Sequence, residues 1–170
     1  MLRKIFAIIS IAALALSLLA SCAAQNNEEL SKNLASKASS VAPVQQIKAG
    51  ESLSIPLAGL SEYASIFPVE VDGTTMEVIA VKASDGSLRT AFNTCQVCYG
   101  SGKGYYKQEG SKLVCQNCGN SFTMDQVGVV AGGCNPWPIT AEERTATDDT
   151  LSISYDVLAA AKQIFANWKV

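Results

Sequence analysis

The chain has 170 residues, 48% of them hydrophobic, which fits one soluble domain with an export segment better than two domains. The formal net charge is −2 and no dense run of Lys and Arg follows residue 22, which argues against a nucleic-acid partner. The chain has no histidine, so it cannot form a histidine-based catalytic triad, a Rieske centre or a C-x-x-C-H haem attachment.

The first residues resemble a bacterial signal peptide that ends in a lipidation site. Arg3 and Lys4 precede an apolar run over residues 5–20, which is short for a bilayer span of about 20 residues. The run ends in Leu-Ala-Ser-Cys at residues 19–22, which resembles the lipobox, where cleavage precedes a cysteine that then carries lipid. We expect residues 1–21 to be a signal peptide and lipidated Cys22 to anchor the protein to the extracytoplasmic face of the bacterial cell membrane. The alternative is an ordinary signal peptide with an incidental Cys22.

The next segment is predicted to be a tether. Residues 23–48 contain no aromatic residue and little apolar material to bury. With the lipidated Cys22, residues 22–48 would form a flexible tether that reaches on the order of 28 Å, from roughly 5–6 Å times the square root of its length. The folded domain is then expected over residues 49–170.

Two stretches near the ends of this domain resemble each other. Residues 51–67 and 149–165 align without gaps and share six of seventeen positions. Each reads as a short alternating strand followed by an amphipathic helix, so the sequence predicts two related strand-helix units. Asp156 is the predicted N-cap of the second helix. An apolar stripe on that helix is interpreted as core; it consists of Val157, Leu158, Ala161, Ile164, Phe165 and Trp168.

Between these stretches the sequence predicts a hairpin that leads to the first cysteine. Residues 75–92 alternate apolar and polar side chains on both sides of Asp85-Gly86, a strong turn signal. The second predicted strand, from Leu88 to Phe92, runs directly toward Cys95. We therefore expect a sheet to support the cysteine segment.

Four cysteines have the spacing of a metal site. The pattern C-x2-C, sixteen residues, C-x2-C is typical of four thiolates around one ion and comprises Cys95, Cys98, Cys115 and Cys118. The intervening residues 104–108 and 112–114 can pair as strands across residues 109–111, which would return the second pair to the first. Two redox dithiols or disulfides are the alternative. The predicted fold class is thus α+β, a small antiparallel β domain with two strand-helix units and a four-cysteine, zinc-ribbon-like metal-binding hairpin.

A fifth cysteine, Cys134, follows two glycines and precedes Asn-Pro. We interpret it either as a fifth sulfur next to the metal or as a buried free thiol in a tight turn. Four or five thiolates suit zinc, a single iron or an iron-sulfur cluster, so the spacing leaves the metal open.

The cysteine region resembles the C-terminal domain of the FtrD-like, membrane-associated iron-sulfur-containing proteins of bacteria, a domain of unknown function. The likeness covers about residues 50–167 and includes Asp85-Gly86, Arg89, Ala91-Phe92, Gly104-Tyr105, both cysteine pairs and residues 132–136. The resemblance implies that Cys95, Cys98, Cys115 and Cys118 form the metal site with Cys134 as a candidate fifth ligand, and that the cofactor is an iron-sulfur cluster or iron. Many relatives carry several membrane helices and are associated with ferrous-iron permease systems, whereas in this chain we expect one signal peptide and a lipid anchor in place of the helices.

These observations lead to hypotheses from different classes. The first is a redox or electron-transfer accessory to iron or metal transport, with a membrane transport or redox protein as partner. The second is a structural zinc-ribbon binding module of a membrane-surface lipoprotein, with zinc as the metal. A third is trafficking of a soft ion such as copper(I). An enzyme is the least favoured class, because no set of acid, base and nucleophile stands out, and residues 142–149 read as a solvated loop.

Overall fold

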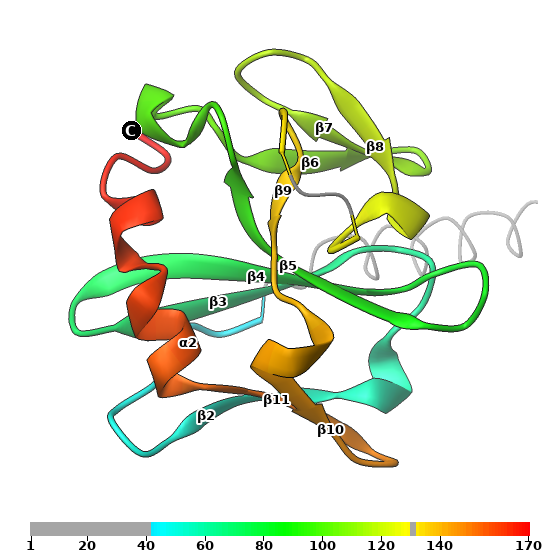
Figure 1. Ribbon diagram of the computed structural model, residues 1–170, viewed down its shortest axis with the longest axis vertical. Coiled ribbons are helices and arrows are strands. Elements are labelled where there is room, and N and C mark those ends of the chain that lie inside the picture. Colours follow the sequence, from blue (N-terminus) through cyan, green and yellow to red (C-terminus); the bar gives the residue numbers. More distant parts are fainter. Residues whose placement is uncertain (1–41, 130–131) are drawn as a thin grey trace, which may run out of the picture. The chain divides into compact units, whose positions relative to one another are not determined.

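The computed structural model describes residues 42–129 and 132–170 (Figure 1). These residues are mostly β structure, with one described α-helix of six residues, α2 (Tyr155–Ala160). The strands are β1 (Gln45–Gln46), β2 (Ser52–Pro56), β3 (Ser65–Val71), β4 (Thr74–Lys82), β5 (Leu88–Cys95), β6 (Tyr106–Glu109), β7 (Lys112–Cys115), β8 (Ser121–Thr123), β9 (Pro136–Pro138), β10 (Arg144–Ala146) and β11 (Thr150–Ser154). The 3-10 turns are η1 (Leu57–Gly59), η2 (Tyr99–Ser101), η3 (Met124–Gln126), η4 (Ala141–Glu143) and η5 (Lys162–Phe165).

The strands form three sheets. The central sheet has the order β1-β3-β4-β5-β9, the helix-side sheet β10-β11-β2 and the cysteine-side sheet β6-β7-β8. Neighbouring strands are antiparallel except β1 and β3, which are parallel. Figure 1 shows the central sheet between the other two, with α2 next to the helix-side sheet.

The central strand β4 explains how one sheet serves two cores. Val78 and Ala80 belong to the hydrophobic cluster on the helix side, whereas Ile79 and Val81 belong to the cluster on the cysteine side. All four are fully buried. Because side chains alternate along a strand, a run of consecutive apolar residues is what a sheet covered on both faces requires.

The helix-side core is built mainly from paired aliphatic residues. In the register of β11 with β2, Leu151 lies opposite Ile55 and Ile153 opposite Leu53, and none of the four is exposed. The predicted helical stripe is confirmed as core, because its members are buried or pack against this cluster. The predicted N-cap at Asp156 is wrong. Ser154 caps the helix through its side-chain oxygen, which accepts a hydrogen bond from the N–H of Val157, and Asp156 lies in the first turn.

The prediction of two strand-helix units is not confirmed. Residues 149–165 do contain β11 followed by α2 and η5, but residues 51–67 contain β2, the three-residue turn η1 and the start of β3. Ile66 and Phe67 pair with Ile79 and Val78 of β4, so long-range strand pairing outweighs the helical pattern there. The helix content is correspondingly lower than the predicted α+β class implies.

The folded part begins before residue 49. Gln45 and Gln46 pair with β3, and the side chain of Ile47 is 6% exposed within the helix-side core. Residues 45–48 are therefore not part of a tether. The predicted signal peptide, Cys22 and the rest of the tether up to residue 41 lie outside the described residues. Among the helices of the described ranges, none has the length and apolar character to cross a bilayer.

Both predicted hairpins are confirmed. β4 and β5 pair through Lys82 and Leu88, and Gly86 in the connecting loop has a φ of +81°, which glycine adopts without steric cost. β6 and β7 pair through Glu109 and Lys112, with Gly110 in the turn.

Candidate metal centre

The first cysteine turn, residues 95–98, starts at the end of the central sheet. Cys95 is the last residue of β5, and its buried side chain joins the cysteine-side cluster together with Ala91 of the same strand. The N–H of Cys95 donates to the carbonyl of Gly104 at 2.7 Å. The N–H of Cys98 donates to Cys95 Sγ at 3.3 Å, as expected where a two-residue gap turns backbone donors toward a sulfur.

The second cysteine turn, residues 115–118, follows the hairpin of β6 and β7. Tyr106 lies opposite Cys115 in this hairpin, and the N–H of Gln116 donates to the carbonyl of Tyr105 at 2.8 Å. The N–H of Cys115 donates to the carbonyl of Asn120 at 2.9 Å, which closes the turn. The hairpin therefore returns the second turn to the first, as predicted.

Cys134 is positioned by a residue within the first cysteine turn. The N–H of Gln96 donates to the carbonyl of Asn135 at 3.1 Å. The side-chain oxygen of Gln96 accepts from the N–H of Gly132 at 2.9 Å. The hydroxyl of Tyr106 donates to the carbonyl of Cys134. These contacts hold Cys134 beside the two turns. Sequence analysis did not identify Gln96, because nothing in the spacing distinguishes it from any other residue inside a C-x2-C pair.

The five thiols form one cluster, here called the five-thiol cluster, which consists of two sets of three. The sulfurs of each set lie within 4.8 Å of one another; the sets are Cys95, Cys98, Cys115 and Cys98, Cys118, Cys134. Cys134 Sγ lies 3.7 Å from Cys98 Sγ and 3.2 Å from Cys118 Sγ. All five are free thiols. Since Cys118 groups with Cys134 and not with Cys95 and Cys115, the predicted four-cysteine zinc-ribbon arrangement is not confirmed.

Burial differs between the two sets. Cys95, Cys98 and Cys115 are all buried, whereas Cys118 is exposed and Cys134 is intermediate. The buried set lies within the cysteine-side cluster, whose other buried members include Leu113, Met124 and Val127. One side of the five-thiol cluster is thus shielded from water and the other reaches the surface.

The surroundings shift the thiol pKa values in opposite directions. Burial raises the pKa of Cys115 to about 12. The backbone N–H of Asn120 lowers the pKa of Cys118. Burial alone would raise the pKa of Cys95, but the nearby Tyr106 hydroxyl and the backbone N–H groups of Cys98 and Val97 outweigh burial and lower the pKa. Tyr106 therefore influences the Cys95 thiol through its hydroxyl, in addition to packing in the cysteine-side cluster.

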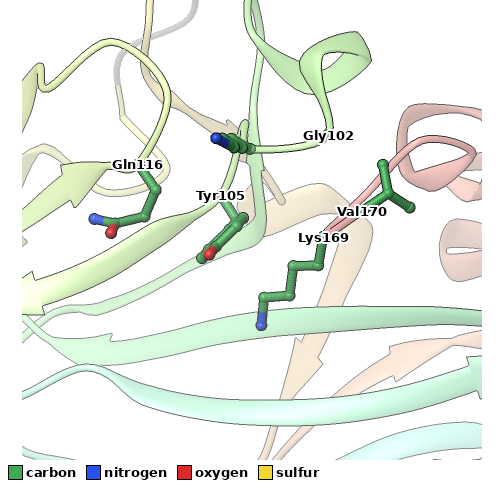
Figure 2. A pocket seen from close by; sticks show the side chains of 6 residues that line it. Gly102, Tyr105, Gln116, Lys169 and Val170 are labelled. Carbon is green, nitrogen blue, oxygen red and sulfur yellow. The ribbon is translucent and has the colours of Figure 1, made fainter.

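A hollow of 280 Å³ lies beside the second cysteine turn (Figure 2). Its lining includes Gln116, Tyr105 and Lys169. Lys169 Nζ lies 2.6 Å from Glu77 Oε1 and 5.0 Å from the centroid of the Tyr105 ring. Glu77 neutralises this lysine, Lys103 is the other cationic residue of the lining, and we assign the hollow no ligand.

The donor set fits a metal centre. Thiolates are preferred ligands of zinc and of iron-sulfur clusters, and the five-thiol cluster provides five of them within a short distance. The buried apolar side chains around Cys95 and Cys115 restrict access of water, which is one of the factors that set the reduction potential of an iron site. The arrangement is therefore able to hold zinc, iron or an iron-sulfur cluster.

Comparison with known proteins identifies the family. No curated protein and no solved structure matches the chain. A family model described as membrane iron-sulfur containing protein FtrD-like matches residues 61–165, which is more than half of the chain and includes the whole five-thiol cluster. The chain therefore belongs to the FtrD-like family of membrane iron-sulfur containing proteins.

Proposed function

We propose that the protein is a lipid-anchored, extracytoplasmic metal protein that serves as a redox or electron-transfer accessory to iron transport. Its cofactor is an iron-sulfur cluster or iron. The ligands are drawn from the five-thiol cluster: Cys95, Cys98, Cys115, Cys118 and Cys134. The family description supports iron-sulfur as the cofactor and a membrane context for the protein.

The five-thiol cluster is the observation that carries this proposal. Its buried set is shielded by apolar side chains, and its exposed edge at Cys118 brings the site to the surface. Iron bound there would supply one-electron redox chemistry. A site that is shielded on one side and open on the other suits exchange of electrons with a protein that docks at the open edge.

The surface at the first cysteine turn supports a docking partner. Val97 lies between two of the cysteines and is 63% exposed, and the neighbouring Tyr99 is 39% exposed. Apolar and aromatic side chains at the surface are enriched in the centres of protein interfaces. A membrane transport or redox protein would contact this surface next to Cys118.

The lipid anchor is proposed from the N-terminal sequence. The apolar run over residues 5–20 and the Leu-Ala-Ser-Cys sequence resemble a lipoprotein signal. The Cys22→Ser protein should no longer partition with membranes after cell fractionation. If it remains in the membrane fraction, the apolar run is itself the anchor and lipidation is not required.

Metal analysis tests the cofactor. The full chain is produced in cells supplied with both iron and zinc and purified without oxygen, and iron, zinc and acid-labile sulfide are measured together with visible absorption. We expect bound iron and charge-transfer absorption that bleaches on reduction. A colourless protein with stoichiometric zinc and no iron would overturn the proposal.

The second candidate is a structural zinc site in a binding module. With Zn–S bonds of about 2.3 Å, two sulfurs of a tetrahedral site lie about 3.8 Å apart. The 3.7 Å separation of Cys98 and Cys134 sulfurs matches this value. Because zinc has no redox chemistry, such a site would only brace the surface around Val97, and the same metal analysis separates the two candidates.

A further inference from the structure

We infer that the five-thiol cluster provides two metal positions that share the Cys98 thiolate. The inner position is formed by Cys95, Cys98 and Cys115, and the outer position by Cys98, Cys118 and Cys134. Each position takes one thiophilic divalent ion. The inference deepens the proposed function and rests on its claim that these thiols bind metal.

The grouping of the sulfurs is the first argument. A single tetrahedral ion accepts four sulfurs, so it would leave one of five without a metal. The structure does not single out one sulfur in this way. Each of the five belongs to a set of three whose members are mutually within 4.8 Å, and only Cys98 belongs to both. Two ions with one bridging thiolate use all five sulfurs.

The placement of Cys134 is the second argument. Its loop is held by Gln96 through the carbonyl of Asn135 and the N–H of Gly132, and by the Tyr106 hydroxyl through its own carbonyl. These contacts come from the first cysteine turn and from β6, which are the elements that also position the inner set. They fix the Cys134 sulfur 3.7 Å and 3.2 Å from those of Cys98 and Cys118.

Charge is the third argument. Five thiolates with one divalent ion leave three uncompensated negative charges in a partly buried site, whereas two such ions leave one. Among the described residues, no Lys or Arg side chain donates a hydrogen bond to a sulfur of the cluster, and Arg89, Lys162 and Lys169 pair with the carboxylates of Asp85, Asp72 and Glu77. A second divalent ion bound to the thiolates would compensate two of these three charges directly.

The two positions differ in access to solvent. The inner set is buried throughout, so an ion there exchanges slowly. The outer set includes the exposed Cys118 and the intermediate Cys134, so an ion there reaches solvent and exchanges first. The outer position is thus the one at which a soluble chelator or a docking protein gains access to metal.

Cobalt(II) titration under anaerobic conditions tests the inference. The full chain is used in detergent with Cys22→Ser in every sample, so that five of its six cysteines remain. We expect thiolate-to-cobalt absorption to rise up to two equivalents. The paramagnetic resonance signal of the first ion should weaken as the second binds, because a shared thiolate couples the two ions. The chelator-accessible fraction should be one equivalent.

Two variants assign the positions. Cys134→Ser should bind one equivalent that resists the chelator, because the outer set is broken and the inner set is intact. The matched control Ser121→Ala changes an exposed residue of the cysteine-side sheet and should still bind two. If Cys134→Ser does not fold, as judged by circular dichroism, the stoichiometry of the parent chain and of Cys118→Ser decides.

The outcomes separate this inference from the proposed function. A parent chain that binds one equivalent, or a Cys134→Ser protein that still binds two, overturns the two-position inference while the thiols remain a metal site. A parent chain that binds no cobalt(II) overturns both.

Discussion

The two faces of the central sheet are covered in different ways. On the helix side, fully buried aliphatic residues from β2 and β11 face β4, and α2 and η5 close the core with Leu158 and Phe165. On the cysteine side, the covering strands have only three or four residues, and three of the buried members of the cluster are cysteines. Apolar burial stabilises the helix side, and we propose that the cysteine side depends on metal ligation as well.

Metal removal should give the largest difference between the two sides. Zinc binding to small metal-dependent peptides is worth roughly 10–16 kcal/mol and is coupled to their folding. We expect a strong chelator to abolish hydrogen-exchange protection of amides in β6, β7 and β8 while those in β4 and β11 stay protected. Equal loss of protection on both sides would contradict the comparison.

Truncation of the helix-side core should destabilise the protein even when metal is bound. Leu151 is fully buried opposite Ile55, so Leu151→Ala should destabilise the protein by about 2–5 kcal/mol through lost burial and the cavity left behind. Urea unfolding of the metal-loaded protein measures this change. The control Ser152→Ala, one residue away on the other face of the strand, should have little effect. A Leu151→Ala change below about 1 kcal/mol would mean that the core collapses around the truncation.

A smaller effect is expected at Gly104, which packs against the first cysteine turn. A Cβ at Gly104 would overlap the carbonyl of Cys98 and lie 2.8 Å from the nitrogen of Tyr99, so Gly104→Ala must displace the turn. We expect weaker metal binding and a loss of about 1–3 kcal/mol in stability. Gly100→Ala is the matched control, because its Cβ would meet nothing within 4 Å. Equal metal affinities of the two variants would show that the turn yields without cost to the site.

The smallest effect is expected at the hairpin that supports both sides. Gly86 has a φ of +81° and an open environment, so Gly86→Val should cost roughly 1 kcal/mol or more from backbone conformation alone. Thermal unfolding should show a modest fall in Tm with metal content unchanged. An unaltered Tm would mean that the loop adopts another conformation in the variant.

Local signals in the sequence predicted the parts of the fold that depend on neighbouring residues. The turn glycines Gly86 and Gly110 marked both hairpins, and the spacing of apolar residues identified the buried stripe of the last helix. The stretch containing Ile66 and Phe67 was predicted as helix but is a strand, because its pairing with β4 involves residues far along the chain. Apolar periodicity does not report such pairing.

The candidate metal centre was likewise predictable where it depends on neighbouring residues and not where it depends on distant ones. The spacing of the two cysteine pairs indicated that they would meet, and the glycines before Cys134 indicated a tight turn there. The grouping of Cys134 with Cys98 and Cys118 was open in the sequence, because it depends on hydrogen bonds from Gln96 and Tyr106 across the fold. A sequence pattern gives the ligand types, whereas contacts between distant segments decide which sulfurs are neighbours.

The central claim is that the five-thiol cluster holds iron through sulfur. Iron K-edge X-ray absorption of the anaerobically purified full chain tests it most directly, because the spectrum reports the atoms bound to the metal. We predict a first coordination shell made of sulfur in the parent chain, and loss of that sulfur-bound iron in Cys98→Ser, which removes the one thiol that belongs to both sets of three. A shell of oxygen or nitrogen, or a sulfur shell that persists in Cys98→Ser, would contradict the claim.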